Sequence, residues 1–182
     1  MGTRDDLLVA AKKCLAERGY AKTTVRHIVA VSGTNLAAIN YHFRTREALL
    51  HQAMVESVAD AVDEIVRSIA VGDDLEPRLD FLWSRLTGSF VTERELWAAN
   101  IEALAAALHS PELRARIAED QQIARTELGG ALGTGLDAED RASLGAVVMT
   151  MLSGLLVQWM IDPDGAPTPE RISAGLRALA SG

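Results

Sequence analysis

Residues 24–47 have the sequence TVRHIVAVSGTNLAAINYHFRTRE, and this stretch decides the fold of the chain. Thr24 is a good N-cap for a first helix, along which aliphatic residues recur at three- and four-residue spacing. Gly33 enters the left-handed backbone region at little cost and so ends that helix. Asn35 is a good cap for a second helix. The stretch therefore predicts two short helices around a tight turn, the geometry of a helix-turn-helix.

The second of these helices has one apolar face and one face suited to a DNA groove. Leu36, Ile39 and Phe43 are expected to face the interior. The remaining positions carry small or hydrogen-bonding side chains, namely Ala37, Ala38, Asn40, Tyr41 and His42. Small side chains allow close approach to base edges, an amide can pair with adenine, and tyrosine, histidine and arginine can hold phosphates. We therefore interpret this helix as a DNA-recognition helix.

The residue identities in this stretch resemble the DNA-binding signature of the tetracycline-repressor (TetR) family of bacterial regulators. The resemblance rests on Thr-Val-Arg-x-Ile at residues 24–28, on Gly33, and on Ile-Asn-Tyr-His-Phe-x-Thr-Arg-Glu-Ala-Leu at residues 39–49. It covers residues 4 to about 50, roughly a quarter of the chain.

The resemblance implies a dimeric transcription factor, usually a repressor, that binds a pseudo-palindromic operator and is released by a small-molecule effector. It implies phosphate contacts by five residues, Thr24, Asn35, Tyr41, His42 and Arg46. It implies base-edge contacts by five more, Arg26, Leu36, Ala37, Ala38 and Asn40. Three residues depart from the common pattern, since Val29 and Ser32 stand where the family often has alanine and Arg46 where it often has lysine. Arg46 keeps the positive charge that a phosphate contact requires.

The charge of the chain is unevenly distributed. The chain has 182 residues, 48% of them hydrophobic, and a net charge of −7. Residues 1–46 hold eight basic and three acidic side chains, a net charge of +5, which leaves −12 for the remainder. A basic head attracts phosphates, while an acidic body discourages non-specific coating of DNA. This length and composition suit a small head, residues 1–46, on a larger body, residues 47–182.

The helical pattern continues along the whole chain. Arg4 to Arg18 forms a first helix that ends at Gly19, and a fourth helix runs from Arg46 past the head. Apolar residues then recur at helical spacing without any strand-like alternation. The glycine-rich residues 129–136 are expected to form a turn, and they lack the lysine of a phosphate-binding loop. The sequence thus predicts an all-α protein, and the resemblance implies about nine helices in a three-helix head and a helical ligand-binding and dimerisation body.

Residues 142–161 contain no charged side chain and are long enough to span a bilayer. Against a membrane span, acidic residues rather than basic ones follow this segment, and several hydroxyl and amide side chains interrupt it. Small residues at four-residue intervals instead favour close helix packing. The expected dimer interface comprises Ala146, Thr150, Gly154, Gln158, Ile172 and Leu176. The resemblance likewise implies a four-helix bundle made from two helices of each subunit.

The sequence provides little basis for catalysis. The four histidines lie in no metal-binding spacing, and no nucleophile motif is present, so neither an enzyme nor a cofactor is expected. Cys14 is the single cysteine and is expected to be a small buried residue. The N-terminus does not resemble a secretion signal, which favours a cytoplasmic protein.

The effector implied by the resemblance is small and mainly apolar. Bulky apolar side chains and two amides that interrupt apolar stripes are candidates for its pocket, namely Trp83, Phe90, Trp97, Asn100, Gln121 and Met149. Each of the bulky residues could equally belong to the core. The alternative function is a helical small-molecule-binding protein whose head does not read DNA.

Overall fold

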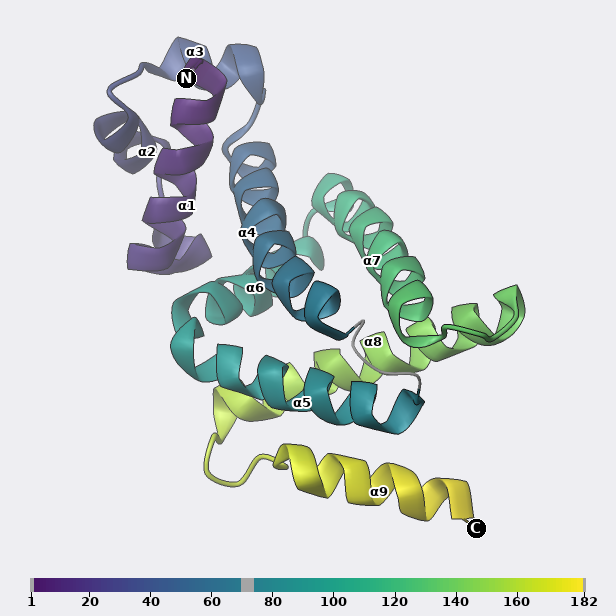
Figure 1. The fold of residues 1–182 in the computed structure, drawn as a ribbon. Coiled ribbons are helices and arrows are strands. Elements are labelled where there is room, and N and C mark those ends of the chain that lie inside the picture. The colour runs from purple at the N-terminus through teal and green to yellow at the C-terminus, as the bar shows by residue number, and fades with distance from the viewer. Residues whose placement is uncertain (1, 70–73, 182) are drawn as a thin grey trace. The chain divides into compact units, whose positions relative to one another are not determined.

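The structure, a computed structural model, describes residues 2–69 and 74–181, and it describes side chains outside residues 59–69. Helices are the regular elements throughout the described residues (Figure 1). In chain order they are α1 Thr3–Lys22, α2 Val25–Ser32, α3 Leu36–His42, α4 Arg46–Ile69, α5 Leu75–Thr92, α6 Arg94–Ala107, α7 Pro111–Leu132, α8 Ala138–Ile161 and α9 Pro169–Ser181. The predicted all-α class is confirmed.

The chain forms two compact units. The first comprises Met1–Asp60 and Glu95–Glu119, and the second comprises Ala61–Arg94 and Asp120–Gly182. The first unit thus combines the three N-terminal helices with the beginning of α4, nearly all of α6 and the beginning of α7. The division between residues 1–46 and 47–182 stays a prediction about function.

The core of the first unit is built around α1. Leu7, Ala11 and Cys14 on this helix have no exposed surface, which confirms that the single cysteine is buried. Helices α2 and α3 add Ile28 and Ile39, both buried. The inner face of α6 consists of alanines at four-residue spacing, which let this helix pack closely, namely Ala99, Ala103 and Ala107. Burying a leucine or isoleucine side chain contributes about 1.5–3 kcal/mol, so this shared core holds the short helices α2 and α3 in place.

In the second unit, α5 packs against α8 and α9. Its buried stripe is bulky, with Leu82, Trp83, Leu86 and Phe90. Polar contacts also hold α9 against α5. Asp80 of α5 accepts a hydrogen bond from Ser173 of α9, and Glu76 of α5 pairs with Arg177 of α9 at 2.6 Å. These contacts place α9 alongside α5 (Figure 1).

The prediction of a turn at residues 129–136 was wrong for residues 129–132. Helix α7 continues to Leu132, so Gly129 and Gly130 are helical. Gly129 lies against α8, where an added Cβ would be 2.2 Å from the carbonyl oxygen of Arg141. A Cβ on Gly145 of α8 would likewise be 2.0 Å from the carbonyl oxygen of Arg125 on α7. Glycine is present here because the two backbones touch, and not because the chain turns.

Helix α8 is only partly covered within the subunit. It buries Gly145, Val148, Leu155 and Leu156, whereas the face that carries Ala146, Thr150, Gly154 and Gln158 is exposed. The hydroxyl of Thr150 donates to the carbonyl of Ala146 in its own helix, so this hydroxyl needs no polar partner from outside. Among the described residues, α8 is the one helix with the length and composition of a membrane span.

Candidate nucleic-acid interface

Helix α2 begins and ends as the sequence predicts. The Thr24 hydroxyl accepts a hydrogen bond from the backbone N–H of His27 at 3.3 Å, and the His27 Nδ1 accepts from the Thr24 N–H at 3.2 Å. These reciprocal bonds satisfy donors that a helix start leaves open. At the other end, Gly33 has φ +67°, and its N–H donates to the carbonyl of Val29. An added Cβ there would meet no atom of the described residues within 4 Å, so the left-handed backbone accounts for the preference for glycine.

Helix α3 is seven residues long, and its own cap and two buried residues position it. The Asn35 side-chain oxygen accepts from the N–H of Ala38 at 3.0 Å. Ile39 and Phe43 are buried in the first unit, which fixes the rotation of the helix. Leu36 is 55% exposed, so its predicted interior placement was wrong. Leu36 is the first residue of this short helix, and the burial of Ile39 and Phe43 sets the side that faces the interior. The apolar character of Leu36 therefore did not predict its exposure.

The outer face of α3 carries most of the residues expected to contact DNA. Leu36, Ala37, Asn40 and Tyr41 are exposed, and Tyr41 is 84% exposed. Ala38 and His42, by contrast, are half-buried. The rings of Tyr41 and His42 meet edge to face at 4.9 Å between centroids. This face therefore offers one amide, one phenol and small side chains on a helix narrow enough for a major groove.

Helix α4 begins directly after α3, across a short strained connection. Arg44 has φ +67°, a left-handed conformation that is unfavourable for a residue with a Cβ. The Thr45 hydroxyl accepts from the N–H of Ala48 at 3.0 Å and caps α4. Next to this connection, the Arg4 guanidinium lies over the Phe43 ring, 5.4 Å from its centroid. The chain therefore enters α4 in one defined direction.

Arg46 makes contacts that the sequence did not predict. Its Nε donates to the carbonyl of Thr23 at 2.6 Å and its Nη2 to the carbonyl of Tyr20 at 2.6 Å. Its Nη1 pairs with Glu47 at 3.1 Å, and the guanidinium lies 5.5 Å from the centroid of the Tyr20 ring. Arg46 thus ties α4 to the α1–α2 turn. The phosphate contact expected of it stays a prediction, and it would be made by a side chain already held by protein.

The head has six exposed basic side chains, Arg4, Lys13, Arg18, Lys22, Arg26 and Arg44. Two lysines are paired with carboxylates, the half-buried Lys12 with Glu56 at 3.3 Å and Lys13 with Glu17 at 3.9 Å. Arg26 lies on α2 and Arg44 directly follows α3, so both belong to the helix-turn-helix segment and are exposed. Cations there attract phosphates regardless of base sequence.

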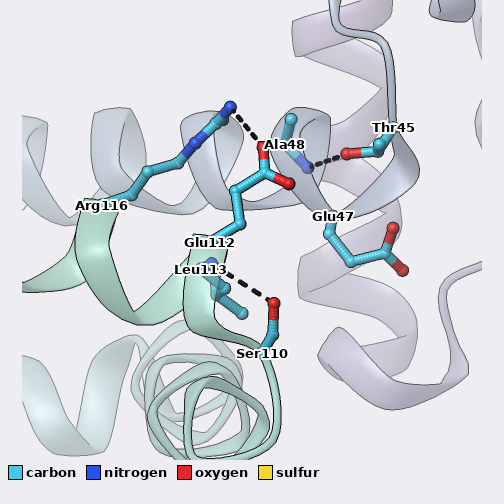
Figure 2. A pocket seen from close by; sticks show the side chains of 7 residues that line it. All are labelled: Thr45, Glu47, Ala48, Ser110, Glu112, Leu113 and Arg116. Carbon is cyan, nitrogen blue, oxygen red and sulfur yellow. Dashed lines mark hydrogen bonds and ion pairs between the residues drawn. The ribbon is translucent and has the colours of Figure 1, made fainter.

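A small hollow in the first unit lies between the beginnings of α4 and α7 (Figure 2). Thr45 caps α4, and Ser110 caps α7 by accepting from the Leu113 N–H at 3.3 Å. Glu112 pairs with Arg116 at 3.0 Å, and Glu47 adds a second carboxylate. Because charged and hydroxyl groups line it, this hollow does not suit a mainly apolar effector.

The six residues expected to line an effector pocket are divided between the two units. Trp97 and Asn100 belong to the first unit, and the other four to the second, namely Trp83, Phe90, Gln121 and Met149. Trp83 has no exposed surface, and its indole N–H has no hydrogen-bond acceptor within the described part of the chain. A buried donor of this kind requires a partner to offset its desolvation. Whether the six residues share a ligand stays a prediction.

Comparison with known families gives two matches along the chain. Residues 7–53 match the model of the bacterial regulatory proteins of the tetR family. Residues 75–181, more than half of the chain, match the model of the C-terminal region of BetI-type transcriptional repressors.

Individual relatives agree with these matches. The HTH-type transcriptional regulator TtgR of Pseudomonas putida is 31% identical over 75 residues, which cover 41% of this chain and 35% of that protein. The HTH-type transcriptional repressor Rv1474c of Mycobacterium tuberculosis is 44% identical over 46 residues, 25% of each chain. The matches thus span about a third or less of the length of these relatives. A transcriptional regulator from Rhodococcus sp. Rha1 has the same fold, with a TM-score of 0.70, 20% identity and coverage of 96% of this chain and 92% of that one.

Proposed function

Because this chain belongs to the tetR family of bacterial regulatory proteins, we propose that it is a transcriptional repressor that binds a pseudo-palindromic operator as a homodimer. Members of the family are regulators and not enzymes. They are soluble DNA-binding proteins, which favours a cytoplasmic location and a protein partner, not lipid, for the exposed face of α8.

The proposal of operator binding rests on the exposed face of α3. Asn40 is exposed, and an amide there suits an adenine edge. Leu36, Ala37 and Ala38 add apolar contacts, and Arg26 adds a charged one from α2. Thr24 and Asn35 already use their oxygens to cap helices, so they would bind phosphate through the hydroxyl and the amide N–H groups. Tyr41, His42 and Arg46 complete the phosphate contacts.

The proposed dimer uses the exposed face of α8. Ala146, Thr150, Gly154 and Gln158 lie on that face, and among the described residues no atom comes within 4 Å of a Cβ at Gly154. Ile172 and Leu176 of α9 are half-buried, next to Ser173 and Arg177, which bond to α5. A two-fold axis through α8 would bury the uncharged surface and link two heads, so that binding of one head raises the effective concentration of the other.

The effector is expected to be small and mainly apolar, with one group that accepts a hydrogen bond. Trp83 supports this proposal, because its buried indole N–H could donate to such a group. An effector that binds better to a form with misaligned heads would lower operator affinity by shifting the population of states.

Fluorescence anisotropy with the intact protein and a duplex from the region upstream of its own gene tests the function. The proposal requires binding to that duplex at least 1,000-fold tighter than to a scrambled duplex at physiological salt. Equal affinity for both duplexes would favour the alternative, a helical small-molecule-binding protein whose head does not read DNA.

A further inference from the structure

Helix α1 is interrupted at Gly19, whose backbone is not helical, and residues 19–24, called here the α1–α2 turn, lead from this kink into α2. A side chain from α6, which is distant in sequence, holds this turn. The Glu102 Oε2 accepts a hydrogen bond from the backbone N–H of Ala21 at 2.7 Å. Gly19 in the same turn has φ +75°. A Cβ at Gly19 would lie 3.1 Å and 3.2 Å from the two carboxylate oxygens of Glu102. The glycine therefore provides both the left-handed backbone and the space that the carboxylate occupies.

A second side chain holds the same turn from α4. The guanidinium of Arg46 donates to the carbonyls of Tyr20 and Thr23, at 2.6 Å each. Glu102 thus engages a backbone donor of this turn, and Arg46 engages two of its acceptors. Hydrogen bonds to ionised groups are about twice as strong as those between neutral groups. We name these two residues, Arg46 and Glu102, the turn clamp.

The clamped turn leads directly into the helix-turn-helix. Thr23 is fully buried, and its hydroxyl donates to the carbonyls of Gly19 and Cys14, so this end of the turn is fixed to α1. The next residue, Thr24, is the cap of α2. A shift of the turn would therefore move the start of α2, and with it the recognition helix α3 that packs beside it.

We propose that Glu102 is a positioning residue for DNA recognition, which holds the α1–α2 turn from α6 while Arg46 holds it from α4. Glu102 touches no DNA in this proposal and acts through the backbone of Ala21. The proposal rests on the proposed function, because it assumes that α3 reads an operator. It explains why a carboxylate, which would repel phosphate, is placed against a basic head.

The test compares Glu102→Ala and Glu102→Gln with Glu95→Ala, a control that removes an exposed carboxylate from the same helix. Two quantities are measured on the intact protein: affinity for operator and scrambled duplexes, and hydrogen exchange of the Ala21 amide by NMR. We expect Glu102→Ala to bind operator about tenfold more weakly, close to the smallest contribution of one hydrogen bond to a charged group. Binding to scrambled DNA should not weaken, and exchange at Ala21 should accelerate while core amides keep their protection.

Glu102→Gln retains a carbonyl acceptor, so it should restore much of the operator affinity and of the Ala21 protection. Glu95→Ala should match the wild type in both measurements. Operator affinity of Glu102→Ala equal to that of the control would overturn the proposal, and so would unchanged exchange at Ala21. If the wild type does not prefer operator DNA, the proposed function itself fails, and the exchange measurement alone then decides whether Glu102 holds the turn.

Discussion

Two adjacent glycines in α7 should respond oppositely to the same substitution. Gly129 lies where α7 crosses α8, whereas a Cβ on Gly130 would have no atom of the described part of the chain within 4 Å. Alanine is favoured over glycine in a helix by about 1 kcal/mol. Gly130→Ala should therefore stabilise the protein by about 0.5–1 kcal/mol, because only the backbone preference changes.

Gly129→Ala should instead destabilise the protein. Its Cβ would lie 2.2 Å from the carbonyl oxygen of Arg141, where ordinary contact begins at 3.4 Å. The obstacle is backbone and cannot rotate away, so α7 and α8 would have to separate by about 1 Å or distort, as in other overpacked cores that lose about 1–3 kcal/mol. The gain in helix preference offsets part of that loss.

Thermal unfolding followed by far-UV circular dichroism, at one fixed protein concentration, measures both variants. For a chain of this size, 1 kcal/mol corresponds to about 2–4 °C in Tm. Tm should rise by a few degrees for Gly130→Ala and fall by several for Gly129→Ala. If both variants were stabilised equally, the backbone contact between α7 and α8 would be refuted.

Three further predictions concern the interface, the dimer and the thiol. Asn40→Ala should weaken the binding free energy for the preferred operator by about 1–3 kcal/mol and leave binding to other sequences unchanged. If the order of affinities for operator variants, measured by anisotropy, did not change, Asn40 would not be a base-contacting residue. Gly154→Arg should leave subunits that are helical by circular dichroism but monomeric or aggregated in sedimentation, with weakened operator binding, because the described residues leave room for a side chain there and the proposed partner does not. A dimer of normal operator affinity would contradict this. Burial raises the pKa of the Cys14 thiol, so a disulfide reagent should label it slowly at pH 8 until the protein unfolds. Since the folded pKa is the higher one, the thiol's contribution to stability should be complete below about pH 8.5 and lost as the pH rises through the folded pKa in urea titrations.

The sequence predicted the local features of the head well. Thr24, Gly33 and Asn35 form the caps and the turn that their residue types favour, because each acts within three or four positions of itself. The burial of Ile39 and Phe43 followed from helical periodicity. Family resemblance supplied what periodicity could not, namely which exposed residues are expected to meet DNA.

Contacts between distant segments were not predictable in the same way. Glu102 and Ala21 are 81 positions apart, and neither residue type indicates the other. Gly129 was expected to form a turn because glycine favours turns, although here it serves the crossing of two helices. Leu36 was placed inside because it is apolar, and only the packing of α3 shows that it faces outward. Such features depend on the space between helices, which one-dimensional periodicity does not contain.

The most direct measurement of the central claim compares a full palindromic operator with a single half-site of the same sequence. The two recognition helices of a dimer should contact half-sites whose centres lie about 34–36 Å apart. Anisotropy titrations of the intact protein at two salt concentrations should show much tighter binding to the palindrome, with a steeper salt dependence because more phosphates are neutralised. Equal affinity and equal salt dependence for both duplexes would contradict dimeric operator recognition by α3.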